Sequence, residues 1–281
     1  MAASKTYAEQ QNIKYAQKIN ELLKIFPEFC REYFNSLEYS KQPRTRLAYA
    51  RDLKTFFEFL IAEFPQYSNY QISDFTLHDI ESVTGQDISD YLRYMKVYDK
   101  DGTTVTNDER AAKRKLCSLR RFYGYYYRYE LISNNPSLKV DMPKIHDKAI
   151  TRLDVNEVAE LLDNVENGNK LTTAQLRTHE KLKCRDLALL TLLLGTGIRV
   201  SECVGLDIND VDFDNDRIKV VRKGGSESFV YFGDEVRAAL LDYMEERKQM
   251  NPDSGHENAL FISSKNKRLC VRSVELLVKK Y

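Results

Sequence analysis

Apolar residues recur at helical spacing through the first half of the chain, with polar positions between them. Positions three and four apart share one face of a helix, so this pattern predicts amphipathic helices. Residues 99–107 are polar and predict a loop before the longest helix, which is expected to stop before Ser133-Asn134-Asn135-Pro136 because these residues favour turns. The expected helices are 13–25, 47–61, 88–95 and 108–129.

The second half mixes helical and strand patterns. Asp154 and Glu157 have the spacing of a capping box and predict the start of a helix that runs to about residue 165. Another helix is expected from about residue 178 to 194, where Gly195 and Gly197 permit a tight turn. Residues 260–263 fit either a strand or a loop. The expected strands are 210–213, 217–221 and 228–232, and the expected later helices are 235–249 and 273–281.

The segment 141–148 is short, charged and without an apolar period, which is typical of an interdomain linker. We therefore expect two domains, a helical one over residues 1–148 that includes the linker and a second one over 149–281. The fold class expected from these elements is mainly α with a small antiparallel β-sheet (α+β).

Composition narrows the class of protein. The 281 residues are 42% hydrophobic and 30% charged with few Gly and Pro, which excludes collagen-like, low-complexity and disordered chains. No apolar run approaches the roughly 18–20 residues of a membrane helix, and the start of the chain lacks the apolar stretch of a signal peptide. The five cysteines are widely spaced without metal-ligand spacing. We expect reduced thiols, no metal site, no membrane partner and a cytoplasmic location.

Charge is unevenly distributed although the net charge is only +1. Residues 1–148 sum to about +3 and residues 149–281 to about −2, and between Arg110 and Arg128 there are seven basic residues and no acidic one. On a helical wheel one face of this helix is cationic and the opposite face is apolar. Such a face is either a solvated surface or a contact for phosphates, and its lack of acidic partners favours phosphates. The cationic face consists of Arg110, Lys113, Arg114 and Arg121.

A second basic cluster comprises Lys41, Arg44, Arg46 and Arg51, around the start of the helix expected over 47–61. Pro43 suits the first turn of a helix, where free backbone N–H groups attract anions. This cluster either contacts phosphate or is an ordinary exposed helix end, and the sequence fits both interpretations.

Arg199 follows the glycine turn at residues 195–197 and lies at the entry of a short helix. A guanidinium held there can grip a phosphate through two parallel hydrogen bonds, and Glu202, three residues on, can fix its rotamer. The same spacing also fits a structural surface ion pair. Lys223 lies beside two glycines in the turn between two predicted strands, which is usually an ordinary turn position.

The run Gly197-Ile198-Arg199-Val200-Ser201-Glu202, followed by Leu206 and Asp212, resembles the first active-site motif of the tyrosine recombinase (phage integrase) family. By this resemblance Arg199 matches the family's first catalytic arginine and Lys223 its hairpin lysine. The resemblance extends over about residues 35–281 and is Xer-like. In the first half it rests on Thr45, Tyr49, Leu53, Phe56 and Leu60, and on residues 111–123 through Asn135-Pro136.

The resemblance implies a helical SAM-like core-binding domain and a catalytic domain for site-specific DNA recombination. In that chemistry a tyrosine attacks the scissile phosphate and forms a 3′-phosphotyrosine intermediate. Arg199 would stabilise the charged phosphorus centre with Glu202 in support, and Lys223 would protonate the leaving 5′-oxygen. The implied partners are a double-stranded recombination site and further copies of the protein as a dimer or tetramer. No cofactor is implied.

The sequence departs from the family pattern after Lys223. The family places a His-x-x-Arg motif and the nucleophilic tyrosine there, but no histidine in these 281 residues is followed by arginine at that spacing. Tyr281 lies much closer to Arg199 than the family's nucleophile does, and we expect it not to be the nucleophile. The chain is thus expected to be a truncated recombinase that binds DNA without cleaving it, which leaves its status as an enzyme open. The alternative is a naturally shortened, non-catalytic DNA-binding protein that competes for recombination sites.

Overall fold

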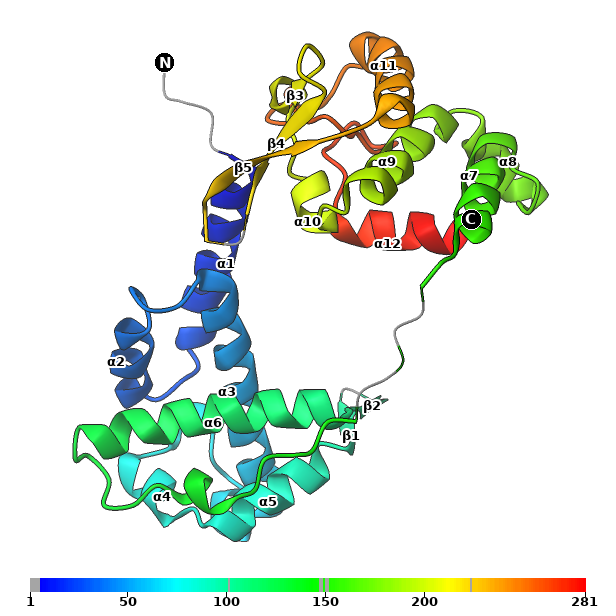
Figure 1. Ribbon diagram of the computed structural model, residues 1–281. Coiled ribbons are helices and arrows are strands. Elements are labelled where there is room, and N and C mark those ends of the chain that lie inside the picture. The colour runs from blue at the N-terminus through cyan, green and yellow to red at the C-terminus, as the bar shows by residue number, and fades with distance from the viewer. Residues whose placement is uncertain (1–5, 101, 147–148, 150–151, 223) are drawn as a thin grey trace. The chain divides into compact units, whose positions relative to one another are not determined.

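The computed structural model describes residues 6–100, 102–146, 149, 152–222 and 224–281 (Figure 1). Contacts between residues group the chain into two compact units. One unit is Glu9–Ala149, and the other combines Ile150–Tyr281 with Met1–Ala8. The described part is mainly α-helical with two small antiparallel sheets, which confirms the expected fold class. No helix among the described residues is both long enough and apolar enough to cross a membrane.

The unit Glu9–Ala149 is built almost entirely of helices. The helix α6 contacts α3, α5 and the short helix η3, so it lies at the centre of this unit (Figure 1). The elements are α1 (Tyr7–Leu23, of which Tyr7 and Ala8 group with the other unit), α2 (Glu28–Ser36), α3 (Pro43–Glu63), η1 (Pro65–Tyr67), η2 (Ile72–Asp74), α4 (Leu77–Ser82), α5 (Gly85–Tyr94), β1 (Val97–Lys100), β2 (Thr103–Thr106), α6 (Glu109–Arg128) and η3 (Pro136–Lys139).

Aromatic side chains fill the core of this unit. The side chains of Phe56, Tyr91, Phe122 and Tyr126 are fully buried and come from three different helices. Most of their ring contacts are tilted or edge-to-face, such as the Tyr33–Phe122 pair with 5.3 Å between ring centroids. This is the favoured geometry of aromatic pairs because the positive edge of one ring meets the negative face of another.

The sequence predicted the long helix of this unit well, whereas short elements were missed. Asp108 caps α6 by accepting a hydrogen bond from the Ala111 N–H, and the helix ends close to the predicted position. The expected loop over 99–107 is wrong, because β1 and β2 pair there as an antiparallel hairpin. The helices α2 and α4 had not been predicted.

The other unit surrounds helix α9, which is apolar on nearly every side and packs against α7 and α11. Its sheet has the strand order β3-β4-β5, with every neighbouring pair antiparallel. The elements are α7 (Val155–Asn167), α8 (Thr173–His179), α9 (Lys183–Thr196), α10 (Val200–Cys203), η4 (Ile208–Asp210), β3 (Val211–Asp212), β4 (Arg217–Val221), β5 (Glu227–Tyr231), α11 (Asp234–Gln249) and α12 (Val271–Lys280).

Two glycines shape the end of α9. Gly197 ends the helix in the left-handed region with φ 64°, where residues with a side chain are strained. A Cβ atom on Gly195 would lie 2.6 Å from a methyl group of Val236 on α11, so only glycine allows this close approach. Gly195 thus allows α9 to pack closely on α11, and Gly197 lets the chain turn from α9 toward α10.

Most predicted elements of this unit are confirmed, with one exception. The capping box of Asp154 and Glu157, the three strands and the two last helices all appear. The helix expected over 178–194 is wrong at its start, because α8 ends at His179 and a new helix, α9, begins at Lys183. Residues 260–263 form no strand of the sheet, although Ile262 makes an isolated bridge with Arg268.

Tyr7, near the start of the chain, also belongs to this unit. Tyr7 packs against its hydrophobic core, and the guanidinium of Arg268 lies over the Tyr7 ring, 5.4 Å from the centroid. Arg268 itself donates hydrogen bonds to the carbonyl oxygens of Val204 and Leu206.

Candidate functional site

Arg199 is positioned by the turn that follows α9. It is the N-cap residue of α10, and its own backbone is extended (φ −70°, ψ 147°). The Glu202 carboxylate accepts one hydrogen bond from the Arg199 backbone N–H to Oε2 and another from the guanidinium to Oε1, each at 2.9 Å. The spacing of three residues that had been noted in the sequence therefore does bring the two side chains together.

A second arginine shares the same carboxylate. Arg222 directly follows β4, and its guanidinium donates to Glu202 Oε2 at 2.9 Å. Its Nε donates to the Ser228 hydroxyl at 3.0 Å, so the side chain is held from two sides. Arg199 and Arg222 thus present two guanidinium groups around one carboxylate, a feature that sequence spacing had not indicated.

The electrostatics of this cluster favour an anion. The Glu202 side chain is only 4% exposed, whereas that of Arg199 is 66% exposed. Burial by itself raises the pKa of Glu202, but the N–H groups of Arg199 and the charge of Arg222 outweigh it, and the pKa lies below its usual value. One ionised carboxylate faces two permanent cations, which leaves one positive charge in excess at the surface.

Lys223, the other predicted catalytic residue, lies outside the described residues, and its role stays a prediction. Its neighbours define the turn between β4 and β5. Gly224 and Gly225 both have positive φ, at 104° and 92°, and the Arg222 N–H donates to the Ser226 carbonyl.

Tyr281 is engaged in a different cluster of polar side chains. Its hydroxyl donates to Asp186 Oδ2 and contacts His179 Nδ1, each at 3.0 Å. Lys280 donates to the same hydroxyl at 2.7 Å. Burial and the Asp186 charge raise the pKa of Tyr281 well above its usual value. A tyrosine whose deprotonation is disfavoured is a poor nucleophile at neutral pH.

The basic surface predicted in the other unit lies on α6 and at the start of α3. Arg110 and Arg121 of α6 are exposed and Lys113 is half-buried, while Arg44 and Arg51 of α3 are exposed. Lys41, which precedes α3, is half-buried. Within the described part of the chain, the ion pairs include none that involves Lys41, Arg44, Arg110, Lys113 or Arg121.

Two of the predicted basic residues are already partnered. The Arg46 side chain is only 10% exposed and forms an ion pair with Glu38 at 3.5 Å. Arg114 pairs with Asp52 of α3. The expectation that the cationic face of α6 has no acidic partner is therefore wrong at Arg114, because the fold brings a carboxylate to it from another helix.

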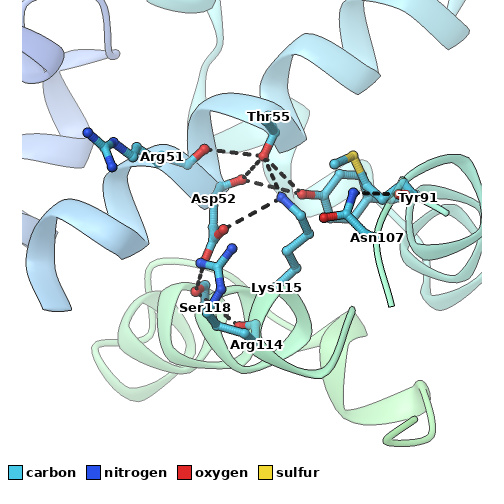
Figure 2. A network of polar contacts seen from close by, with 9 residues as sticks. Arg51, Asp52, Thr55, Tyr91, Asn107, Arg114, Lys115 and Ser118 are labelled. Carbon is cyan, nitrogen blue, oxygen red and sulfur yellow. Dashed lines mark hydrogen bonds and ion pairs between the residues drawn. The ribbon is translucent and has the colours of Figure 1, made fainter. Parts of the chain in front are cut away.

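Asp52 is the centre of a polar network between α3, α5 and α6 (Figure 2). It accepts from the Ser118 hydroxyl at 2.7 Å and lies 3.6 Å from the Lys115 ammonium, in addition to its contact with Arg114. Lys115 also donates to Thr55 Oγ1 at 3.2 Å. The sequence had given no reason to select Asp52 or Arg222, since each acts on a partner distant in the chain.

No group of three or more His, Cys, Asp or Glu side chains that could hold a metal ion occurs among the residues that the structure describes.

Comparisons with known proteins agree with this geometry. Residues 151–281 match the model of the Phage integrase family. Over 266 residues the chain is 32% identical to tyrosine recombinase XerC of Caldanaerobacter subterraneus subsp. tengcongensis, and the alignment covers 92% of this chain and 68% of that protein.

Solved structures resemble the fold. The Tn1549 transposon integrase in complex with circular intermediate DNA aligns with a TM-score of 0.60 and 19% identity, covering 90% of this chain and 78% of that one. A lambda integrase tetramer bound to a Holliday junction aligns with a TM-score of 0.58 and 15% identity, covering 89% of this chain and 62% of that one.

The likeness in sequence extends through both units, and the likeness in fold accompanies it. The residues that first suggested the resemblance, Arg199 and Glu202, are joined by hydrogen bonds in the structure. The chain belongs to the tyrosine recombinase (phage integrase) family.

Proposed function

We propose that this chain binds the double-stranded DNA of a recombination site and that its Arg199 cluster receives a DNA phosphate. The observation that carries the proposal is the exposed Arg199 guanidinium, fixed by the buried Glu202 and accompanied by Arg222. A guanidinium whose rotamer is already fixed loses little conformational entropy when it grips a phosphate. In a complete site, Arg199 would stabilise the charge on the phosphorus centre and Lys223 would protonate the 5′-oxygen.

The basic surface of the other unit supports binding to the DNA backbone. Its exposed arginines, Arg44, Arg110 and Arg121, are available to phosphates. Two structural neighbours in the family, the Tn1549 integrase and the lambda integrase tetramer, are complexes with DNA. By analogy with that tetramer, we also propose that copies of this protein associate on DNA.

We further propose that these 281 residues do not cleave DNA by themselves. They contain no His-x-x-Arg sequence, so the second arginine of the family's site has no counterpart at the expected motif. The hydroxyl of Tyr281 is bonded to Asp186 and His179 and has a raised pKa.

Two measurements test the proposal. Gel shifts with a labelled duplex at increasing salt should show affinity that falls steeply with salt, because binding releases counterions. Duplex binding that is absent at low salt would refute the DNA-binding function. A nicked suicide substrate, which traps covalent protein–DNA adducts, should give no adduct with this chain. An adduct that survives denaturation would refute the inability to cleave.

A further inference from the structure

Asp52 is a buried carboxylate that faces two cations. Its side chain is only 2% exposed, and it contacts the Lys115 ammonium and the Arg114 guanidinium, which come from adjacent positions of α6 (Figure 2). The Lys115 side chain is also buried, at 6% exposure, whereas that of Arg114 is 49% exposed. Arg114 can therefore contact a group in solvent, whereas the buried Lys115 ammonium cannot.

The charges of Asp52, Arg114 and Lys115 do not cancel among themselves, because one carboxylate faces two cations. Asp52 and Lys115 form a buried pair of opposite sign, as burial of an ion requires. Three further partners in the network, Ser118, Thr55 and Tyr91, are neutral, and burial raises the pKa of Tyr91, so its hydroxyl stays protonated. The positive charge of Arg114 is left over at the surface.

The contact also restricts the Arg114 side chain. An exposed arginine has rotamer entropy that it loses in part when it binds a phosphate. One terminal nitrogen of Arg114 is fixed by Asp52, which is itself fixed by Ser118, and the half-exposed remainder of the guanidinium retains further donors. Arg114 lies one helical turn from Arg110 and two from Arg121, on the face where both are exposed.

We propose that Asp52 is a positioning residue for DNA binding, which holds the Arg114 guanidinium in the orientation that contacts a phosphate. This inference rests on the proposed DNA-binding function and adds to it the residue that orders one of the contacts. Asp52 itself touches no DNA in this proposal.

Asp52→Asn separates positioning from simple charge. The substitution removes a negative charge, so electrostatics alone would tighten DNA binding. If Asp52 positions Arg114, binding weakens instead, by about two- to tenfold, because the arginine must be ordered during binding. The probe is a labelled duplex of about 30 base pairs and arbitrary sequence, titrated at several salt concentrations.

A double-mutant cycle assigns the effect to Arg114. Arg114→Ala should lower the salt slope by about 0.9, as expected for one lost phosphate contact. Adding Asp52→Asn to Arg114→Ala should cause no further weakening, whereas adding it to Arg110→Ala should weaken binding by the same factor as in the wild type. Arg110 is the matched control because it lies on the same face and forms no ion pair among the described residues.

Tighter binding by Asp52→Asn, or equal weakening in the Arg114→Ala and Arg110→Ala backgrounds, would overturn the inference while leaving the DNA-binding function intact. A wild-type chain without salt-sensitive duplex binding would overturn the function itself. If Asp52→Asn fails to fold by circular dichroism, Ser118→Ala replaces it, since this change frees the carboxylate without altering charge. Ser118→Ala should weaken binding only where Arg114 is present, and an effect that persists in Arg114→Ala contradicts the proposal.

Discussion

The carboxylate of Glu202 is joined to two arginines that lie in different parts of the chain. Arg199 is a near neighbour in sequence, and Arg222 arrives at the end of β4. Removal of a buried partner of this kind leaves the remaining groups without compensation, which costs more than an exposed ion pair contributes. Glu202 is therefore the residue on which the geometry of the candidate site depends.

We predict that Glu202→Gln destabilises the unit by about 1.5–3 kcal/mol at neutral pH, because the amide turns a donor toward the guanidinium groups. The pKa of Glu202 is lowered in the folded state, so its contribution is complete above about pH 4.3, the ordinary value, and is lost as the pH falls through the folded value. Urea unfolding should thus show a difference between wild type and variant that shrinks as the pH falls below the ordinary value. The exposed Glu245→Gln serves as the control, and a difference that is independent of pH would contradict the prediction.

Tyr281→Phe removes a hydroxyl that contacts Asp186, His179 and Lys280. Asp186 is almost fully buried and would lose one of its donors, so we expect a loss of about 1–3 kcal/mol in the free energy of unfolding. Duplex binding should be unchanged. Tyr39→Phe, at a fully exposed tyrosine, should leave stability within about 0.5 kcal/mol. A fully stable Tyr281→Phe variant would show that the Tyr281 hydroxyl contributes nothing to stability.

At the scale of elements, α6 separates its basic residues into two roles. Arg110 points to solvent, whereas Arg120 donates to the carbonyl oxygens of Ser137 and Val140, at 3.3 and 2.7 Å. Arg120 thereby ties the helix to the segment around η3. Arg110 thus contributes to the exposed basic surface, whereas Arg120 on the same helix stabilises the fold.

This separation gives a matched pair of variants with the same change in charge. Arg110→Ala should weaken duplex binding and lower the salt slope by about 0.9, with little effect on stability. Arg120→Ala should lower the free energy of unfolding by about 1–3 kcal/mol, since two buried carbonyls lose a donor, and should leave the salt slope unchanged. Thermal unfolding of both variants measures the stability change, and gel shifts at several salt concentrations measure the salt slope. Equal effects on the salt slope would contradict the assigned roles.

The elements differ in how well the sequence predicted them. The strongly periodic helix α6 and the capping box at Asp154 are local signals, and both were predicted correctly. The hairpin of β1 and β2 was not predicted because its four-residue strands are mostly exposed and show no apolar alternation. The break between α8 and α9 occurs within a run that reads as one helix.

In the candidate site too, contacts between residues close in sequence could be predicted and contacts between distant residues could not. Arg199 and Glu202 are three residues apart, so their pairing could be predicted from the sequence. Arg222 and Asp52 could not, because their partners Glu202 and Arg114 are brought to them only by the folded chain. The buried state of Arg46 was likewise hidden, since an arginine near a helix start is usually exposed.

At the scale of the whole molecule, the described residues form two hydrophobic cores, one in each unit. Leu116 is fully buried in one and Leu240 in the other. We predict that Leu116→Ala and Leu240→Ala each cost about 2–5 kcal/mol in the unit that contains the residue and little in the other. Hydrogen exchange followed by mass spectrometry should show the loss of protection confined to Glu9–Ala149 or to Ile150–Tyr281. Loss of protection throughout the chain in either variant would indicate that the units unfold together.

The packing of Tyr7 against the core of the unit that contains Ile150–Tyr281 has a consequence for the order of folding during synthesis. Residues Glu9–Ala149 leave the ribosome as a continuous segment and can complete their fold while the rest of the chain is still being made. The other unit must close a loop that spans most of the chain before Tyr7 meets Arg268. We therefore expect a slower final folding step for that unit, since contacts between distant positions form late.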